Sequence, residues 1–287
     1  MKHDLLEIME ERMESFSKGQ RYIAKYIISN YEKAAYMTAA KLGAISGVSE
    51  STVVRFAIEL GYEGYPEMQK ALQDLVRTKL TSVQRLEVTN TRIGSSEVLD
   101  KVLTSDIDKI RQSLEEIDRK AFYEAIDKII DAKNIYIIGV RSSSTLAGFM
   151  NYSFRMIFDN VKFIQTTSGS EMFEQIMRIG QGDVMIAISF PRYSKRIINA
   201  VEFARANGAD VVALTDSSQS PIATYADQLL TACSDMASFV DSLVAPMSII
   251  NAMVVELSRK KQEELTVRLH ELENIWEKYD VYDKNVR

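Results

Sequence analysis

The chain has 287 residues, of which 46% are hydrophobic, 26% are charged and only 4 are proline, and it carries a single cysteine. This composition excludes disordered, fibrous and disulfide-stapled chains, and Cys233 with His3 and His270 cannot form a clustered zinc site. The net charge of −5 argues against a generally basic nucleic-acid binder but allows one small module with local positive potential.

Length and hydropathy favour a two-domain protein outside the membrane. Domains usually contain roughly 100–200 residues, so this chain has room for two. The amino terminus, MKHDLLE, lacks the apolar run of a signal peptide. The most apolar region, residues 243–255, is broken by Pro246, Ser248 and Asn251 and is shorter than the ~20 residues that span a bilayer. We therefore expect a cytoplasmic protein with no membrane partner.

Residues 1–80 show helical spacing and no alternating strand, so we expect an all-helical first domain. Between Thr81 and Ser96 this periodicity fades and turn-forming residues gather, which predicts a linker. A connecting helix is expected to follow, capped by Ser95 or Ser96 and carrying an apolar stripe from Val98 to Ile110. Linker and connecting helix together occupy residues 81–118.

From residue 119 to the end, short apolar runs alternate with helical segments. The runs are residues 135–138, 161–164, 184–188, 211–214 and 228–231. Continuous apolar runs are typical of strands buried on both faces, so they predict an α/β domain with a five-stranded parallel sheet flanked by helices. Ligand sites in such sheets lie beyond the carboxyl ends of the strands. The last part of the chain, from Asp241 to about Lys278, is expected to be helical again.

The stretch from Thr38 to Tyr65 has the spacing of a helix-turn-helix. Gly47 separates two short helical segments, and Gly43 is small enough to let them pack closely. An apolar wedge would lie between them, formed by Leu42, Val48, Val53 and Phe56. Any corner between two helices uses glycine and apolar residues, so a purely structural corner remains open.

A DNA-reading surface is predicted on the second helix of this corner. Ser49 is a good N-cap, and Ser51, Thr52 and Arg55 would project from the helix toward phosphates or a guanine edge. Lys41 and Glu50 complete the predicted DNA-binding set. Because the corner carries so few basic residues, we expect affinity to depend on a few placed contacts in a dimer.

Hydroxyl-rich loops follow the first three predicted strands and are suited to an anionic ligand. Backbone N–H groups at a helix start, with hydroxyls beside them, can hold a phosphate. The predicted set is Ser142, Ser143 and Ser144 after the first strand, Thr166 and Ser168 after the second, and Ser189, Arg192 and Ser194 after the third. A solvated basic turn at Arg192, Lys195 and Arg196 is the structural alternative.

Taken together, the helix-turn-helix spacing and the hydroxyl-rich loops make the chain resemble the RpiR family of bacterial transcriptional regulators. The run GVSESTVVRFAIELGYEGYPEM is similar to that family's recognition helix, and the loops are similar to the patterns G-x-G-x-S-x-x-x-A and S-x-S-G-x-[ST] of sugar isomerase (SIS) domains. Arg141 stands where the second glycine of the first pattern usually lies, and Pro191 and Arg192 replace the Ser-Gly pair of the second. The segments TDSSQSP and YAD also match the family and indicate a strand end, a turn closed by Asp216 or Ser217, and a helix starting at Pro221.

The resemblance implies a sugar-metabolism regulator in which a phosphorylated sugar alters binding to operator DNA, with a homodimer or tetramer as the active form. From this resemblance we expect no catalytic residue, no metal and no cofactor. The alternative is an aldose–ketose phosphosugar isomerase, which needs a base; Glu171 and Asp241 are candidates, while His270 lies in a polar helical run. A nucleotide enzyme is disfavoured because G-x-G-x-x-G is absent, and a serine hydrolase because G-x-S-x-G is absent.

Overall fold

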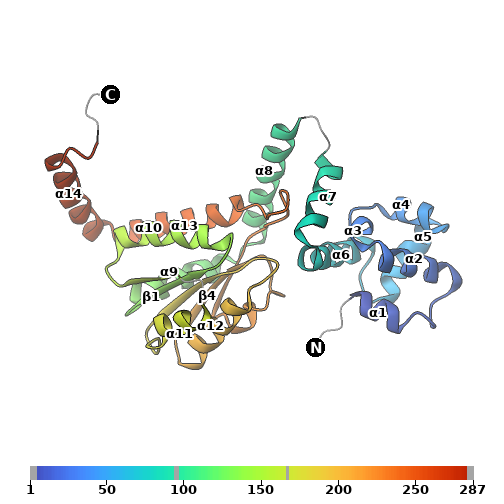
Figure 1. The fold of residues 1–287 in the computed structure, drawn as a ribbon, viewed down its shortest axis with the longest axis horizontal. Coiled ribbons are helices and arrows are strands. Elements are labelled where there is room, and N and C mark those ends of the chain that lie inside the picture. The colour runs from blue at the N-terminus through green and yellow to red at the C-terminus, as the bar shows by residue number, and fades with distance from the viewer. Residues whose placement is uncertain (1–4, 94–96, 166–167, 283–287) are drawn as a thin grey trace. The chain divides into compact units, whose positions relative to one another are not determined.

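The structure, a computed structural model that describes residues 5–93, 97–165 and 168–282, divides into two units (Figure 1). One unit is Met1–Val98 with Met236–Val240, and the other is Leu99–Asp235 with Asp241–Arg287. No helix in the described ranges is long and apolar enough to cross a bilayer.

The first unit is all helical, as the sequence predicts. Apolar side chains at helical spacing close one core, in which Phe16, Ile23, Leu42 and Phe56 are fully buried and the rings of Phe16 and Phe56 meet edge to face at 5.2 Å. The helices are α1 (Leu5–Glu11), α2 (Lys18–Ser29), α3 (Tyr31–Ala34), α4 (Ala39–Ser46), α5 (Glu50–Glu59), α6 (Tyr65–Lys79) and α7 (Ser82–Ile93).

Residues of the predicted linker after Thr81, where the sequence favours turns over a helix, form helix α7 instead. The backbone N–H of Thr81 donates to the side chain of Gln84, and the N–H of Gln84 donates to the Thr81 hydroxyl. This reciprocal pair is a capping box, which starts a helix in spite of the threonines and asparagine that follow. The predicted caps Ser95 and Ser96 lie outside the described residues.

Tyr65 joins the start of α6 to the segment before α4. Its hydroxyl donates a 2.7 Å hydrogen bond to the carbonyl oxygen of Met37, and burial raises the pKa of Tyr65 to about 12. Because this pKa is above the ordinary value of 10.0, the contribution to stability is complete below pH 10 and is lost as the pH rises toward about 12.

The variant Tyr65→Phe is therefore expected to lower the free energy of unfolding of the first unit by about 1 kcal/mol, the usual net value of one hydrogen bond. It should also remove a late step from the ultraviolet titration of the tyrosines. Tyr22→Phe, at an exposed ring, is the control and should change neither. An unchanged late step in Tyr65→Phe would contradict the assignment.

The second unit is built on the predicted parallel sheet. Its strands are β1 (Ile135–Gly139), β2 (Val161–Ile164), β3 (Val184–Ile188), β4 (Asp210–Thr215) and β5 (Gln228–Thr231), in the spatial order β2-β1-β3-β4-β5 and all parallel. Every residue of β1 and β3 is buried. This explains the continuous apolar runs, since both faces of the sheet are covered.

Helices cover the two faces of the sheet in separate layers (Figure 1). On one face lie α9 (Arg119–Asp131), α10 (Ser143–Ile157) and α13 (Val244–Lys260); on the other lie α11 (Gly169–Ile176) and α12 (Lys195–Ala206). The helix predicted at Pro221 is wrong, because only a 3-10 turn forms there, η1 (Ala223–Tyr225). Helix α14 (Gln262–Lys278) is the last described helix, and its Trp276 packs edge to face against Tyr282, which follows the helix.

Helix α8 (Val98–Glu116) has its polar side packed and its apolar side exposed. Lys109 and Ser113 are each only 5% exposed, and Lys109 Nζ donates to Ser105 Oγ at 2.8 Å and to Asp106 Oδ1 at 3.3 Å. Ser113 Oγ accepts from the backbone N–H of Cys233. On the adjacent side of the helix, an apolar stripe is 37% to 70% exposed, and its members are Leu99, Leu103, Ile107, Ile110 and Leu114.

Candidate functional site

The corner between α4 and α5 has the close helix packing that the sequence predicts. Gly47 ends α4 in the left-handed conformation, at a φ of 69°. A Cβ at Gly43 would lie 2.9 Å from the carbonyl oxygen of Val48, so a larger residue at 43 would force the two helices apart. Of the four predicted wedge residues, Leu42, Val53 and Phe56 are fully buried, and Val48 is half-buried.

Hydroxyl groups cluster at the amino end of α5. The Ser49 hydroxyl accepts from the backbone N–H of Thr52 and lies 2.9 Å from the hydroxyls of both Ser51 and Thr52. Helix N-termini attract anions, so this end is suited to phosphate oxygens of DNA.

Arg55 lies one turn further along α5 than the hydroxyl cluster. Its side chain is exposed, with Nε 3.4 Å from the Ser51 carbonyl oxygen. Lys41 on α4 and Glu50 on α5 are exposed as well, so five of the six predicted DNA-binding residues are exposed and Thr52 is half-buried. The structure thus brings the predicted set onto one helix-turn-helix corner.

The carboxyl edge of the sheet holds the loops predicted to bind an anion. Strands β1 and β3 are neighbours, with Gly139 opposite Ile188, and β2 lies on the other side of β1. The chain therefore reverses direction across the sheet between β1 and β3, which is the position where ligands bind in doubly wound folds. The loops after β1 and β3 both leave the sheet at this point.

In the loop after β1, the chain turns sharply into α10. A Cβ at Gly139 would lie 2.5 Å from the carbonyl oxygen of Ser143, so only glycine allows the helix start to lie against the strand end. Ser143 is buried, and the Ser144 hydroxyl donates to the carbonyl oxygen of Arg141 at 2.5 Å. Ser142 precedes α10 without making a side-chain cap.

The loop after β3 carries two serines, Ser189 and Ser194, with Arg192 between them. Ser189 is buried, and its carbonyl oxygen accepts a 2.6 Å hydrogen bond from Thr215 Oγ1. Ser194 caps α12 by accepting from the backbone N–H of Arg196. Arg192 between them is exposed.

Sequence reasoning missed one feature of these loops. Arg141 and Arg192 both have left-handed backbones, with φ of 57° and 64°. Only the resemblance, which places glycines at both positions, pointed toward it.

The remaining candidates are spread over the fold. Thr166 lies outside the described residues, and Ser168 precedes α11 with its hydroxyl 2.8 Å from that of Ser170. Of the candidate bases, Glu171 is exposed on α11 and Asp241 is buried before α13. His270 is exposed on α14.

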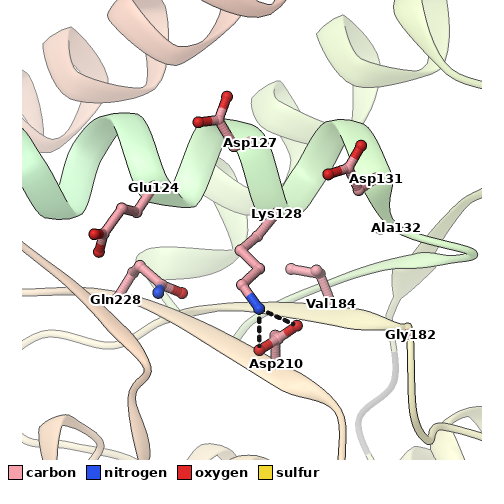
Figure 2. Close-up of a pocket in the computed structure, with 9 residues that line it drawn as sticks. All are labelled: Glu124, Asp127, Lys128, Asp131, Ala132, Gly182, Val184, Asp210 and Gln228. Atoms are coloured by element: carbon pink, nitrogen blue, oxygen red, sulfur yellow. Dashed lines mark hydrogen bonds and ion pairs between the residues drawn. The ribbon is translucent and has the colours of Figure 1, made fainter.

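A hollow of about 570 Å³ lies at the opposite, amino edge of the sheet (Figure 2). Lys128 points from α9 toward the first residue of β4, where its Nζ is 3.0 Å from both carboxylate oxygens of Asp210. Lys260 binds Asp127 at 2.6 Å. These ion pairs join helices to each other and to the sheet, and the described residues include no group of three or more metal-ligating side chains.

Two family models match the chain. Residues 3–79 match the helix-turn-helix domain of the rpiR family, and residues 128–256 match the SIS domain. The chain belongs to the RpiR family. The first match includes the corner between α4 and α5, and the second includes the loops at the carboxyl edge of the sheet.

Relatives of this RpiR-family chain are similar to it in sequence over most of their own length. The HTH-type transcriptional regulator HexR of Escherichia coli is 28% identical over 231 residues, covering 79% of this chain and 77% of HexR. The structure of the Vibrio vulnificus NanR protein complexed with ManNAc-6P is 25% identical with a TM-score of 0.59, covering 95% of this chain and 97% of NanR. The sugar isomerase domain of an RpiR transcription factor from Sphaerobacter thermophilus is 26% identical with a TM-score of 0.60, covering 62% of this chain and 99% of that domain.

Proposed function

We propose that this chain is a cytoplasmic transcriptional regulator of sugar metabolism whose helix-turn-helix domain binds operator DNA and whose SIS domain binds a phosphorylated sugar. The observation that carries the proposal is the presence, on one chain, of an exposed hydroxyl and arginine surface on α5 and of anion-suited loops at the switch point of the sheet. NanR, solved with ManNAc-6P, supports a phosphosugar as the ligand class. We assign residues 1–80 to DNA binding, 81–118 to the connection and 119–287 to sensing.

Sensing is favoured over catalysis. Aldose–ketose isomerisation requires a base that moves a proton between adjacent carbons. Asp241 is buried before α13 and Glu171 lies on α11, and neither belongs to the loops after β1 and β3. The HexR relative is a transcriptional regulator by name.

The deciding experiment is fluorescence anisotropy of the full chain with DNA from upstream of its own operon, at several salt concentrations, with and without a panel of sugar phosphates that includes ManNAc-6P. Sequence-specific binding that one phosphosugar shifts is expected. For such a shift, the ligand must bind the two DNA-affinity states differently, typically by about 1–3 kcal/mol. No specific binding, together with turnover of a sugar phosphate, would favour the isomerase.

The effector loops are tested by replacing Ser143 and Ser194 together with alanine. We expect the response to the phosphosugar to be abolished and DNA binding to be retained, because both hydroxyls lie in the loops at the switch point. Ser153→Ala is a matched control, since its hydroxyl is bonded to the Phe149 carbonyl further along α10. A normal response in the double variant would place the ligand elsewhere.

A second copy of the chain is the partner we propose for the apolar stripe of α8. Its members, from Leu99 to Leu114, follow one another at intervals of 4, 4, 3 and 4 residues, the spacing of a seam between two helices. The stripe continues into an apolar groove of about 270 Å³ that includes Ile110, Leu114, Phe122 and Ile249. Because the polar side of α8 is the packed one, only another surface can cover the stripe.

The variant carrying Leu103→Glu and Ile107→Glu is expected to be monomeric in sedimentation analysis and to lose most of its operator affinity, since paired half-sites require two reading heads. Met177→Glu, at an exposed apolar side chain beyond α11, is the control and should keep the assembly. A dimer that survives the double substitution would show that α8 is not the seam.

A further inference from the structure

Within the described part of the first unit, helix α5 has one side that neither the core nor another helix covers. Its buried side chains close the core of this unit, and they are Val53, Phe56 and Ala57. Helix α2 lies along a second side, where a Cβ at Gly19 would be 3.6 Å from Thr52 Cγ2. On the same side, the Gln20 side chain donates to the carboxylate of Glu59. The remaining side of α5 is open.

Ile58 lies on this open side. Its side chain is 53% exposed, and its spacing from Ser51 and Arg55 places all three on one face of the helix. Val54, half-buried one turn earlier, extends the apolar surface. Packing does not require isoleucine at position 58, because other residues close the core, and helix propensity does not favour it, because β-branched side chains lower that propensity. Contact with another molecule explains an aliphatic side chain beside an exposed hydroxyl and guanidinium.

The base edges in the major groove of DNA offer one apolar partner. The proposed function places α5 in this groove, where the second helix of a helix-turn-helix lies. Adenine, guanine and cytosine present only hydrogen-bond donors and acceptors there, whereas thymine also presents its C5-methyl group. Apolar side chains contact that methyl group, and the contact removes both groups from water. The chemistry of Ile58 therefore matches thymine and no other base.

We propose that Ile58 contacts the C5-methyl group of an operator thymine and so makes one position of each half-site specific for that base. The roles on the open face divide by charge. Ser51 and Arg55 bind phosphates or a guanine edge, whereas Ile58 carries no charge and contributes discrimination between bases. This inference rests on the proposed function, because Ile58 reaches a base only if α5 enters operator DNA.

The test removes single methyl groups from the DNA. Anisotropy titrations of the full chain compare the operator with versions in which each thymine in turn is replaced by deoxyuridine, which lacks only the C5-methyl group. We expect the parent chain to lose about fourfold in affinity at one thymine of each half-site, the value of one methyl group removed from water. Ile58→Ala should weaken binding to the unmodified operator by about fourfold or more and show no further loss at that thymine. Binding of this variant to unrelated DNA and its salt dependence should not change, because no charge is lost.

Ile45→Ala supplies the matched control. Ile45 is 47% exposed on α4 and undergoes the same chemical change, so its variant should keep the parent chain's loss at the same thymine. The inference is overturned if no deoxyuridine lowers the affinity of the parent chain, or if Ile58→Ala retains the parent chain's loss at that thymine. In either case the proposed function stands as long as the operator is bound more tightly than unrelated DNA. If no DNA is bound specifically, the proposed function and this inference fail together.

Discussion

Arg55→Ala is expected to weaken specific operator binding by roughly 5- to 150-fold, or about 1–3 kcal/mol, the range for loss of one placed guanidinium contact. Arg55 is exposed on α5, one turn beyond the hydroxyls of Ser49, Ser51 and Thr52. Its Nε contact to the Ser51 carbonyl, at 3.4 Å, is long and exposed, so removing the side chain should not unfold the helix. Anisotropy titrations with operator and with unrelated DNA measure the change.

The salt dependence separates two roles of Arg55. A phosphate contact would weaken binding to all DNA sequences and reduce the slope of log affinity against log salt by about one, whereas a base contact would relax specificity at one operator position. Lys120→Ala is the charge-matched control, because Lys120 is 84% exposed on the sensing unit. Identical affinity for Arg55→Ala and the parent chain at every salt concentration would remove Arg55 from the interface.

The sheet could be predicted because its strands are buried on both faces. Val184–Ile188 and Ile135–Gly139 are entirely buried, and such strands require the uninterrupted apolar runs that the sequence displays. The corner between α4 and α5 could be predicted equally well. Close packing of the two helices requires a glycine at Gly43, and the left-handed end of α4 favours one at Gly47. Here backbone geometry and residue type constrain each other directly.

Other features depend on tertiary context and could not be predicted. The sequence of α8 shows an apolar stripe, but only the structure shows that the domain packs against the side of Lys109 and Ser113 and leaves Leu103 and Ile107 exposed. The sequence of α7 does not favour a helix, because its threonines and asparagine have weak helix propensity. The signal that could have predicted the helix is the capping pair of Thr81 and Gln84.

In the loops after β1 and β3, which we propose bind the effector, sequence predicts the hydroxyl positions better than the backbone that holds them. Ser143, Ser189 and Ser194 lie at the switch point as expected. Residue type alone does not reveal that Arg141 and Arg192 keep a conformation typical of glycine, because a departure from the family pattern predicts a changed loop as readily as a strained one. For Gly139, by contrast, the requirement for glycine follows directly from the distance between the strand end and the helix start.

Gly139→Ala is expected to destabilise the sensing unit by about 1–3 kcal/mol or more and to abolish effector binding. The new methyl would lie 2.5 Å from the Ser143 carbonyl oxygen, 3.0 Å from its carbonyl carbon and 3.1 Å from the Ala147 Cβ, and the two nearest atoms are backbone that cannot rotate away. The start of α10 must then move off the end of β1, which carries the hydroxyls of Ser142 and Ser143 out of the loop geometry.

Gly148→Ala, in the same helix, is the matched control with the opposite sign. A Cβ at Gly148 meets nothing within 4 Å, so alanine should stabilise α10 by roughly 0.5–1 kcal/mol through its higher helix propensity. Chemical denaturation followed by circular dichroism measures both changes, and calorimetry with the effector measures binding. Because the two variants make the same chemical change, a destabilisation by Gly139→Ala alone assigns the cost to the close approach of strand and helix; equal effects from the two would refute that assignment.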